Sequence, residues 1–86
     1  MQTLLLVDDE PNIVEGLASQ FEQRYGDGVI VLKSCSGRHA LSVLQNNRGD
    51  VVLSDIRMPD LDGLELIEET ERLWPRTHFV LLSGFE

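Results

Sequence analysis

Three aspartates directly follow two apolar segments of the chain, and their carboxylates could together bind a cation. Asp8 and Asp9 come after the apolar run of residues 4–7, and Asp55 closes the run of residues 51–55. Short apolar runs of this kind suit strands of a parallel sheet that is covered on both faces. Parallel strands end at the same edge of a sheet, so we expect the three side chains to converge. Neighbouring carboxylates repel one another unless a proton or a cation lies among them, and the cluster therefore predicts a cation site.

Mg²⁺ is the ion that such a cluster suits. It is a hard ion that takes a few carboxylates, keeps several waters and accepts phosphate oxygens. A further apolar run, residues 79–82, delivers Ser83 and Gly84 to the same predicted edge. Ser83 offers a hydroxyl donor, and Gly84 offers a backbone N–H with no side chain in the way. Donors of this kind can hold a phosphoryl group, so the edge predicts phosphate chemistry beside the metal.

Strand and helix patterns alternate along the chain, and they must position these groups. Apolar runs predict strands over residues 3–7, 29–32, 51–55 and 79–82. Such alternation with short connections predicts an α/β fold with a parallel sheet and right-handed crossovers. Ligands of open α/β sheets bind beyond the carboxyl ends of the strands, which is where the aspartates are expected.

Three helices are predicted between the strands. Apolar residues recur at helical spacing over residues 11–25, around residues 40–44 and over residues 64–74. We expect Glu10 to cap the first helix before Pro11, and Asp62 to cap the third rather than to bind metal. The apolar residues of the third helix that we expect to point inward are Leu64, Ile67 and Leu73.

Composition limits the classes of function. The chain has 86 residues, enough for one domain, and a net charge of −8, which argues against nucleic-acid binding by these residues themselves. The single cysteine, Cys35, cannot form an internal disulfide, and we expect it to be a small packed residue. No signal peptide and no apolar run long enough for a membrane span are present, so we expect a cytoplasmic protein that does not bind membranes.

Several motifs occur together in a fixed order. They are Asp8-Asp9-Glu10-Pro11, then Asp55 with Met58-Pro59 and Asp62-Gly63, then Ser83-Gly84. In this combination the sequence resembles the receiver domains of two-component response regulators. The resemblance implies a flavodoxin-like fold, strand order 2-1-3-4-5, and a phosphoryl group received from the histidine of a sensor kinase. For residues 1–86 it implies strand order 2-1-3-4, an incomplete, N-terminal portion of a receiver without its fifth strand and last helices.

The resemblance also implies roles for individual residues. Asp55 would be the phosphoacceptor and a metal ligand, Asp9 would bind Mg²⁺ directly, and Asp8 would bind it directly or through water. The backbone carbonyl of Arg57 would be a further ligand. Ser83 would be the switch hydroxyl, with the Gly84 N–H beside it.

One departure from the family concerns a lysine. The family pairs the phosphoryl group with a lysine at the end of its fifth strand, whereas the one lysine here, Lys33, falls on the second strand. We therefore expect phosphorylation to be impaired and some metal binding to remain. The fourth strand becomes an apolar sheet edge, which favours self-association by edge pairing or by a swapped element.

Two alternatives stay open beside the phosphoacceptor. One is a receiver-like dimerisation module that no longer takes phosphate. The other is a Mg²⁺-dependent phosphatase with Asp55 as nucleophile, although such enzymes usually carry a second aspartate where this chain has Arg57. Residues 57–67 and 82–86 look most like receivers joined to AraC-type DNA-binding domains. DNA binding would then belong to an output domain that is absent from this chain.

Overall fold

A parallel β-sheet and three α-helices make up the part of the chain that the structure describes. The computed structural model describes residues 2–47 and 49–82. The elements in chain order are β1 (Gln2–Val7), α1 (Pro11–Tyr25), the 3₁₀ turn η1 (Gly26–Gly28), β2 (Val29–Ser34), α2 (Gly37–Asn46), β3 (Val51–Asp55), α3 (Gly63–Leu73) and β4 (His78–Leu82). The predicted strands and helices are all present, and β3 has the bounds that its apolar run predicts.

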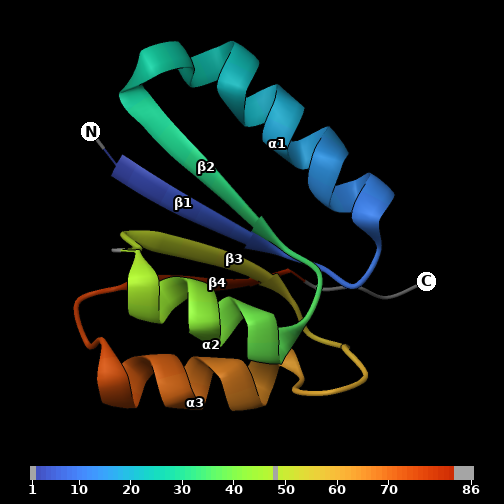
Figure 1. Ribbon diagram of the computed structural model, residues 1–86, viewed down its shortest axis with the longest axis vertical. Coiled ribbons are helices and arrows are strands. Elements are labelled where there is room, and N and C mark those ends of the chain that lie inside the picture. Colours follow the sequence, from blue (N-terminus) through green and yellow to red (C-terminus); the bar gives the residue numbers. More distant parts are fainter. Residues whose placement is uncertain (1, 48, 83–86) are drawn as a thin grey trace.

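The four strands lie in the order β2-β1-β3-β4, and all are parallel. Figure 1 shows β1 and β3 side by side in the middle of the sheet. The point where the strand order reverses therefore lies between these two strands. The register pairs Leu4 with Val51 and Val7 with Ser54, so β1 and β3 end nearly level. The predicted α/β sheet of order 2-1-3-4 is thereby confirmed.

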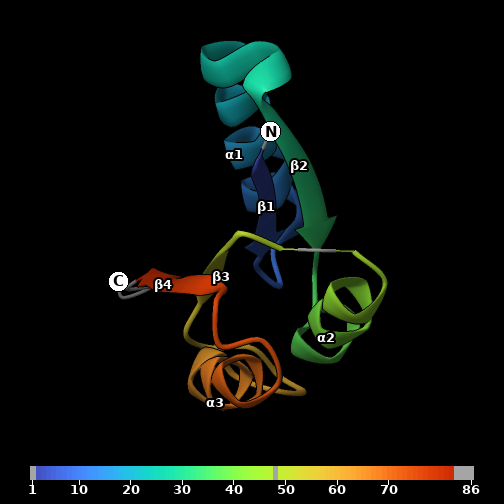
Figure 2. The same ribbon diagram turned by 90° about the vertical axis from the view of Figure 1, so that its left-hand side faces the viewer.

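Each face of the sheet packs against its own helices. On one face, Leu4 and Leu6 of β1 contact Val14 and Ala18 of α1. On the other, α2 and α3 lie next to each other against the sheet (Figures 1 and 2). The core on this second face contains Leu5, Val7, Ala40, Leu44, Val52, Met58 and Leu66. The alternation of side chains along β1 divides the two cores, because successive residues of a strand point to opposite faces.

The helix starts differ in how they are capped. Asp62 caps α3, as predicted: its side chain accepts the Glu65 N–H, and the Glu65 side chain accepts the Asp62 N–H. Ser36 caps α2 by a single side-chain hydrogen bond, in which its hydroxyl oxygen accepts the His39 N–H. Glu10 stands at the start of α1 but makes no capping hydrogen bond with its side chain, so that prediction was wrong. Its extra methylene makes glutamate a poorer cap than the shorter aspartate or serine.

The inward face of α3 also differs from the prediction. Gly63, Leu66 and Thr70 are buried, whereas Leu64 and Leu73 are 54% and 41% exposed. Leu64 lies two positions before Leu66, on nearly the opposite side of a helix with 3.6 residues per turn. Leu73 ends the helix and lines an open pocket instead of the core. Only Ile67, half-buried, partly follows the prediction.

Cys35 and β4 both lie at the surface of the described structure. Cys35 is exposed and not packed, because it follows the last residue of β2 in a surface turn. Within the described residues, β4 is an edge of the sheet, as expected. Its Val80 and Leu82, on the face that α1 covers elsewhere, are 44% and 37% exposed.

Candidate functional site

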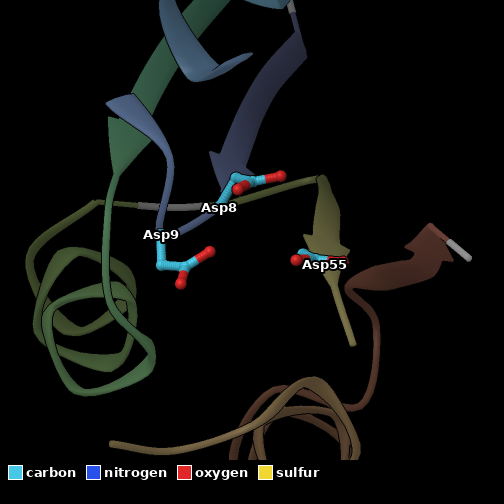
Figure 3. A group of neighbouring side chains, drawn as sticks. All are labelled: Asp8, Asp9 and Asp55. Atoms are coloured by element: carbon cyan, nitrogen blue, oxygen red, sulfur yellow. The ribbon is translucent and has the colours of Figure 1, made fainter. Parts of the chain in front are cut away.

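Three carboxylates meet where β1 and β3 end. Asp8 and Asp9 follow β1, and Asp55 is the last residue of β3. Each offers one carboxylate oxygen, and the three oxygens lie within 4.8 Å of one another. Figure 3 shows Asp8 and Asp9 beside the end of β3, where Asp55 lies. The convergence predicted from the two apolar runs is therefore confirmed, and it follows from the parallel β1–β3 pairing.

The electrostatics of this cluster favour a bound cation. Asp8 is only 9% exposed. Burial raises the pKa of Asp8, and the charges of Asp55 and Asp9 raise it further, whereas the hydrogen bond from the Glu10 N–H opposes the rise. A cation among the three oxygens would offset both the burial of charge and the repulsion. Hard oxygen donors with several charges are what Mg²⁺ prefers, so this donor set fits that ion.

Hydrogen bonds with neighbouring residues fix the Asp55 carboxylate and its backbone. The Ile56 N–H donates to Asp55 Oδ1 at 2.9 Å, which holds one carboxylate oxygen in place. The Ser54 hydroxyl donates to the Asp55 carbonyl oxygen at 2.9 Å. Ser54 itself is fully buried, so this support comes from inside the sheet.

The segment after β3, residues 56–62, forms one wall of the site. Its two ends are tied together by the Gly63 N–H, which donates to the Ile56 carbonyl oxygen at 2.7 Å. A Cβ on Gly63 would overlap the Asp55 carbonyl oxygen, so this close approach requires glycine. Met58 anchors the middle of the segment in the core.

An open cavity of about 380 Å³ lies between this segment and Asp9. Its lining residues are Asp9, Ile56, Arg57, Met58, Pro59 and Asp62. In the described part of the chain, larger pockets of about 510 and 460 Å³ lie elsewhere, and neither is lined by any of the three clustered aspartates. Of the three clustered aspartates Asp9 lines the smaller cavity, and this carboxylate, and not the volume, identifies the cavity as part of the site.

Other predicted site residues stand apart from the cluster or outside the described residues. Ser83 and Gly84 lie outside the residues that the structure describes. Lys33 lies on β2, and its Nζ is 3.2 Å from Oε1 of Glu15 on α1. The lysine lies on the second strand, as the sequence predicted, and the structure adds a surface ion pair between it and α1.

Asp60 is a residue near the site to which the sequence assigned no role. Its Oδ1 accepts the Gly37 N–H at 3.2 Å, and its Oδ2 accepts the Arg38 N–H at 3.1 Å. The hydrogen bond from Arg38, together with those of other backbone N–H groups, lowers the pKa of Asp60. Its partners are 22 and 23 residues away in sequence, so no local pattern could have indicated the contact.

Comparison with protein families gives one match over nearly the whole chain. The sequence model of the response regulator receiver domain matches residues 4–86. The transcriptional regulatory protein YesN of Bacillus subtilis is 34% identical over 85 residues, which are 99% of this chain and 23% of YesN. The response regulator SaeR of Staphylococcus aureus is 38% identical over 84 residues, 98% of this chain and 35% of SaeR. The chain thus spans about a quarter to a third of these curated relatives.

Solved structures agree with this match. The response regulator TrrA of Thermotoga maritima, crystallised in complex with Mg²⁺ and BeF, superposes with a TM-score of 0.89 at 31% identity. The alignment covers 100% of this chain and 72% of TrrA. A receiver domain from Clostridium thermocellum gives a TM-score of 0.87 at 29% identity, covering 98% of this chain and 66% of that one. Among the described residues, no helix combines the length and the apolar character that crossing a membrane would require.

Proposed function

Because this chain belongs to the receiver domain family of two-component response regulators, we propose that Asp55 accepts a phosphoryl group from the histidine of a sensor kinase. The observation that carries the proposal is the convergence of Asp8, Asp9 and Asp55 at the end of β1 and β3. Receiver domains are signalling domains and not enzymes that turn over an external substrate. In the proposed role, the chain catalyses at most its own phosphorylation and dephosphorylation.

In this mechanism, an Asp55 carboxylate oxygen attacks the phosphorus of phosphohistidine. An O–P bond forms, the P–N bond breaks, and the imidazole nitrogen leaves with the bonding electron pair. The Ile56 N–H holds Oδ1 of Asp55 and so orients the carboxylate for the attack. Asp8, Asp9, Asp55 and the Arg57 carbonyl would hold Mg²⁺, which supplies positive charge to the phosphoryl oxygens. We assign Ser83 and Gly84 to the same phosphoryl group, as hydroxyl and N–H donors.

Incubation with Mg²⁺ and acetyl phosphate, followed by intact-mass measurement, tests this function. We expect a base-labile adduct of one phosphoryl group on the wild type and none on Asp55→Asn. Asp27→Asn, an exposed aspartate of η1, is the matched control and should react like the wild type. An adduct that persists in Asp55→Asn would refute the assignment. Because the fifth-strand lysine of the family has no counterpart among these residues, we expect slow adduct formation.

The two alternatives gain no support from the relatives, which are response regulators and sensor proteins. The phosphatase predicts steady release of phosphate from added phosphate esters, and the dimerisation module predicts no adduct at all. The incubation with acetyl phosphate, together with a parallel assay of phosphate release from added esters, therefore distinguishes all three functions.

Self-association through β4 is a second part of the proposal. It is supported by the position of β4 at the sheet edge and by the exposure of Val80 and Leu82. Edge strands with apolar side chains pair readily with other chains, and a lysine on such a strand opposes pairing. Light scattering during size exclusion should detect a dimer at micromolar concentration, and Val80→Lys should shift it toward monomer. A wild type that elutes only as monomer would contradict this part.

The relatives suggest a further partner besides the kinase, which is DNA. YesN and GlrR are named transcriptional regulatory proteins. We propose that this chain belongs to a transcription regulator whose DNA contacts are made by an output domain, of AraC type, outside these residues. The net charge of −8 agrees with a receiver that does not itself touch DNA. A cytoplasmic location completes the proposal.

A further inference from the structure

We infer that Asp60 is a positioning residue for the metal site: it fastens residues 56–62 to the first turn of α2 and thereby fixes the Arg57 carbonyl beside the three aspartates. The part that concerns the metal rests on the proposed function. Asp60 itself contacts neither Asp8, Asp9 nor Asp55 through any hydrogen bond found in the structure, so it would act through the backbone of its own segment.

The contact between Asp60 and α2 uses both carboxylate oxygens. One accepts the Gly37 N–H and the other the Arg38 N–H, at 3.2 and 3.1 Å. These N–H groups belong to the first turn of the helix, where they have no partner within the helix and where the helix dipole favours an anion. A two-point contact fixes the orientation of the carboxylate as well as its position.

The segment and the helix also pack closely at this point. A Cβ on Gly37 would overlap the carbonyl oxygen and the Cβ of Leu61. The backbone of residue 61 therefore rests directly on the start of α2. This packing is independent of the Asp60 hydrogen bonds and brings the same two segments together.

The helix that receives Asp60 is a rigid support. Ala40 and Leu44 of α2 are 0% and 4% exposed and lie in the core with Leu5 and Val52. Ser36 caps the same helix end through the His39 N–H, and its other hydrogen bonds among the described residues are with Ser34 and Ala40 and not with residues 56–62. The N-terminus of α2 is therefore capped twice: by Ser36, which directly precedes the helix, and by Asp60 in the segment of residues 56–62.

Arg57 lies between the fixed points of the segment. On one side the Gly63 N–H ties the Ile56 carbonyl, and on the other Met58 is buried in the core. A methionine side chain is flexible and can slide within a core, so it fixes direction poorly. Asp60, three residues after Arg57, fixes the orientation of this backbone and with it the direction of the Arg57 carbonyl that would bind the metal.

Asp60→Ala and Ser36→Ala form a matched pair that tests this inference, because each removes one cap of α2 and only the first releases residues 56–62. Two quantities are measured at a temperature where circular dichroism shows both variants folded: amide hydrogen exchange at Gly63 without metal, and the dissociation constant for Mg²⁺. We expect Asp60→Ala to accelerate exchange at Gly63 and to weaken Mg²⁺ binding about tenfold, the loss typical of groups that orient metal ligands. Ser36→Ala should leave both quantities at wild-type values.

Asp60→Asn keeps one acceptor oxygen and should fall between the wild type and Asp60→Ala in both measurements; it also replaces the alanine variant if that variant does not fold. Unchanged Gly63 exchange in Asp60→Ala, or equal effects of Ser36→Ala, would overturn the inference. A wild type that binds no Mg²⁺ would overturn the proposed function and the metal-positioning role with it. The exchange at Gly63 would still decide whether Asp60 fastens the segment, so the two failures are distinguishable.

Discussion

Replacement of Asp8 by asparagine should stabilise the folded protein when no divalent cation is present. Asp8 is 9% exposed, and its carboxylate lies with those of Asp9 and Asp55 within 4.8 Å. Asparagine has nearly the same shape, and its amide oxygen can still accept the Glu10 N–H that Asp8 Oδ1 now accepts at 2.9 Å. The substitution therefore removes a charge and leaves the local geometry in place.

The expected gain follows from the spacing of the carboxylates. Two unit charges 4.8 Å apart repel by about 1 kcal/mol in water and by about 3 kcal/mol at an effective dielectric constant of 20. Asp9 is exposed, so solvent screens its repulsion toward the lower value. We expect a gain of about 1–2 kcal/mol, which raises the unfolding midpoint of a domain of this size by about 5–10 °C.

Thermal unfolding followed by circular dichroism, in low salt with a chelator, measures this gain. Glu71→Gln, on the exposed side of α3, removes one negative charge far from the cluster and should leave the midpoint nearly unchanged. Added Mg²⁺ should raise the midpoint of the wild type more than that of Asp8→Asn. A ligand stabilises a protein more strongly the more tightly the folded state binds it, and the variant has lost one of the three carboxylates. The difference between the two should shrink at high salt. A midpoint of Asp8→Asn at or below that of the wild type without metal would refute the electrostatic reasoning.

Two further predictions concern single contacts, and a third concerns how stability depends on pH. Asp62→Ala removes the capping box of α3 and should cost about 1 kcal/mol in urea unfolding, whereas a cost near zero would mean that the cap contributes nothing. Gly63→Ala would force a Cβ against the Asp55 carbonyl and should cost about 1–3 kcal/mol, while Gly16→Ala, with open space around it in α1, should gain up to about 1 kcal/mol; equal effects would contradict the close approach. The pKa of Asp8 is raised in the folded state, so the folded protein binds the extra proton first. The contribution of Asp8 to metal-free stability should therefore increase as pH falls through that raised pKa toward the unfolded-state pKa. The pKa of Asp60 is lowered, so its contribution is present above its unfolded-state pKa and is lost as pH falls through the folded one. Urea midpoints across pH check both signs when the wild type is compared with Asp8→Asn and, separately, with Asp60→Asn. An identical profile for the wild type and Asp8→Asn would count against the Asp8 assignment.

Most of the fold could be predicted because its elements are set by local patterns. The run of residues 51–55 is apolar and short, and it forms β3 with those bounds. Asp62 followed by Glu65 three residues later is a capping box in sequence and in structure. These patterns involve residues that are close in the chain, so the structures they predict do not depend on the tertiary contacts around them.

The errors arose where packing decides. Leu64 and Leu73 looked like core residues by type, yet α3 turns Leu66 and Thr70 toward the sheet and leaves the two leucines exposed. Several apolar residues at helical spacing are compatible with more than one buried face of the helix. Only the packing of the helix against the sheet decides which face is buried. Cys35 was expected to pack because free cysteines often do, but its turn lies on the surface.

By itself, the sequence determined that carboxylates follow the two central strands, and its motifs determined the family. Parallel strands share one edge, so the meeting of Asp8, Asp9 and Asp55 followed once β1 and β3 were neighbours. Only the tertiary structure decided how the segment after β3 is held: the Asp60 carboxylate accepts the Gly37 and Arg38 N–H groups, and residue 61 approaches the start of α2 closely. Hydrogen bonds between groups 22 or 23 residues apart depend on how the whole chain is packed, and no local pattern encodes them.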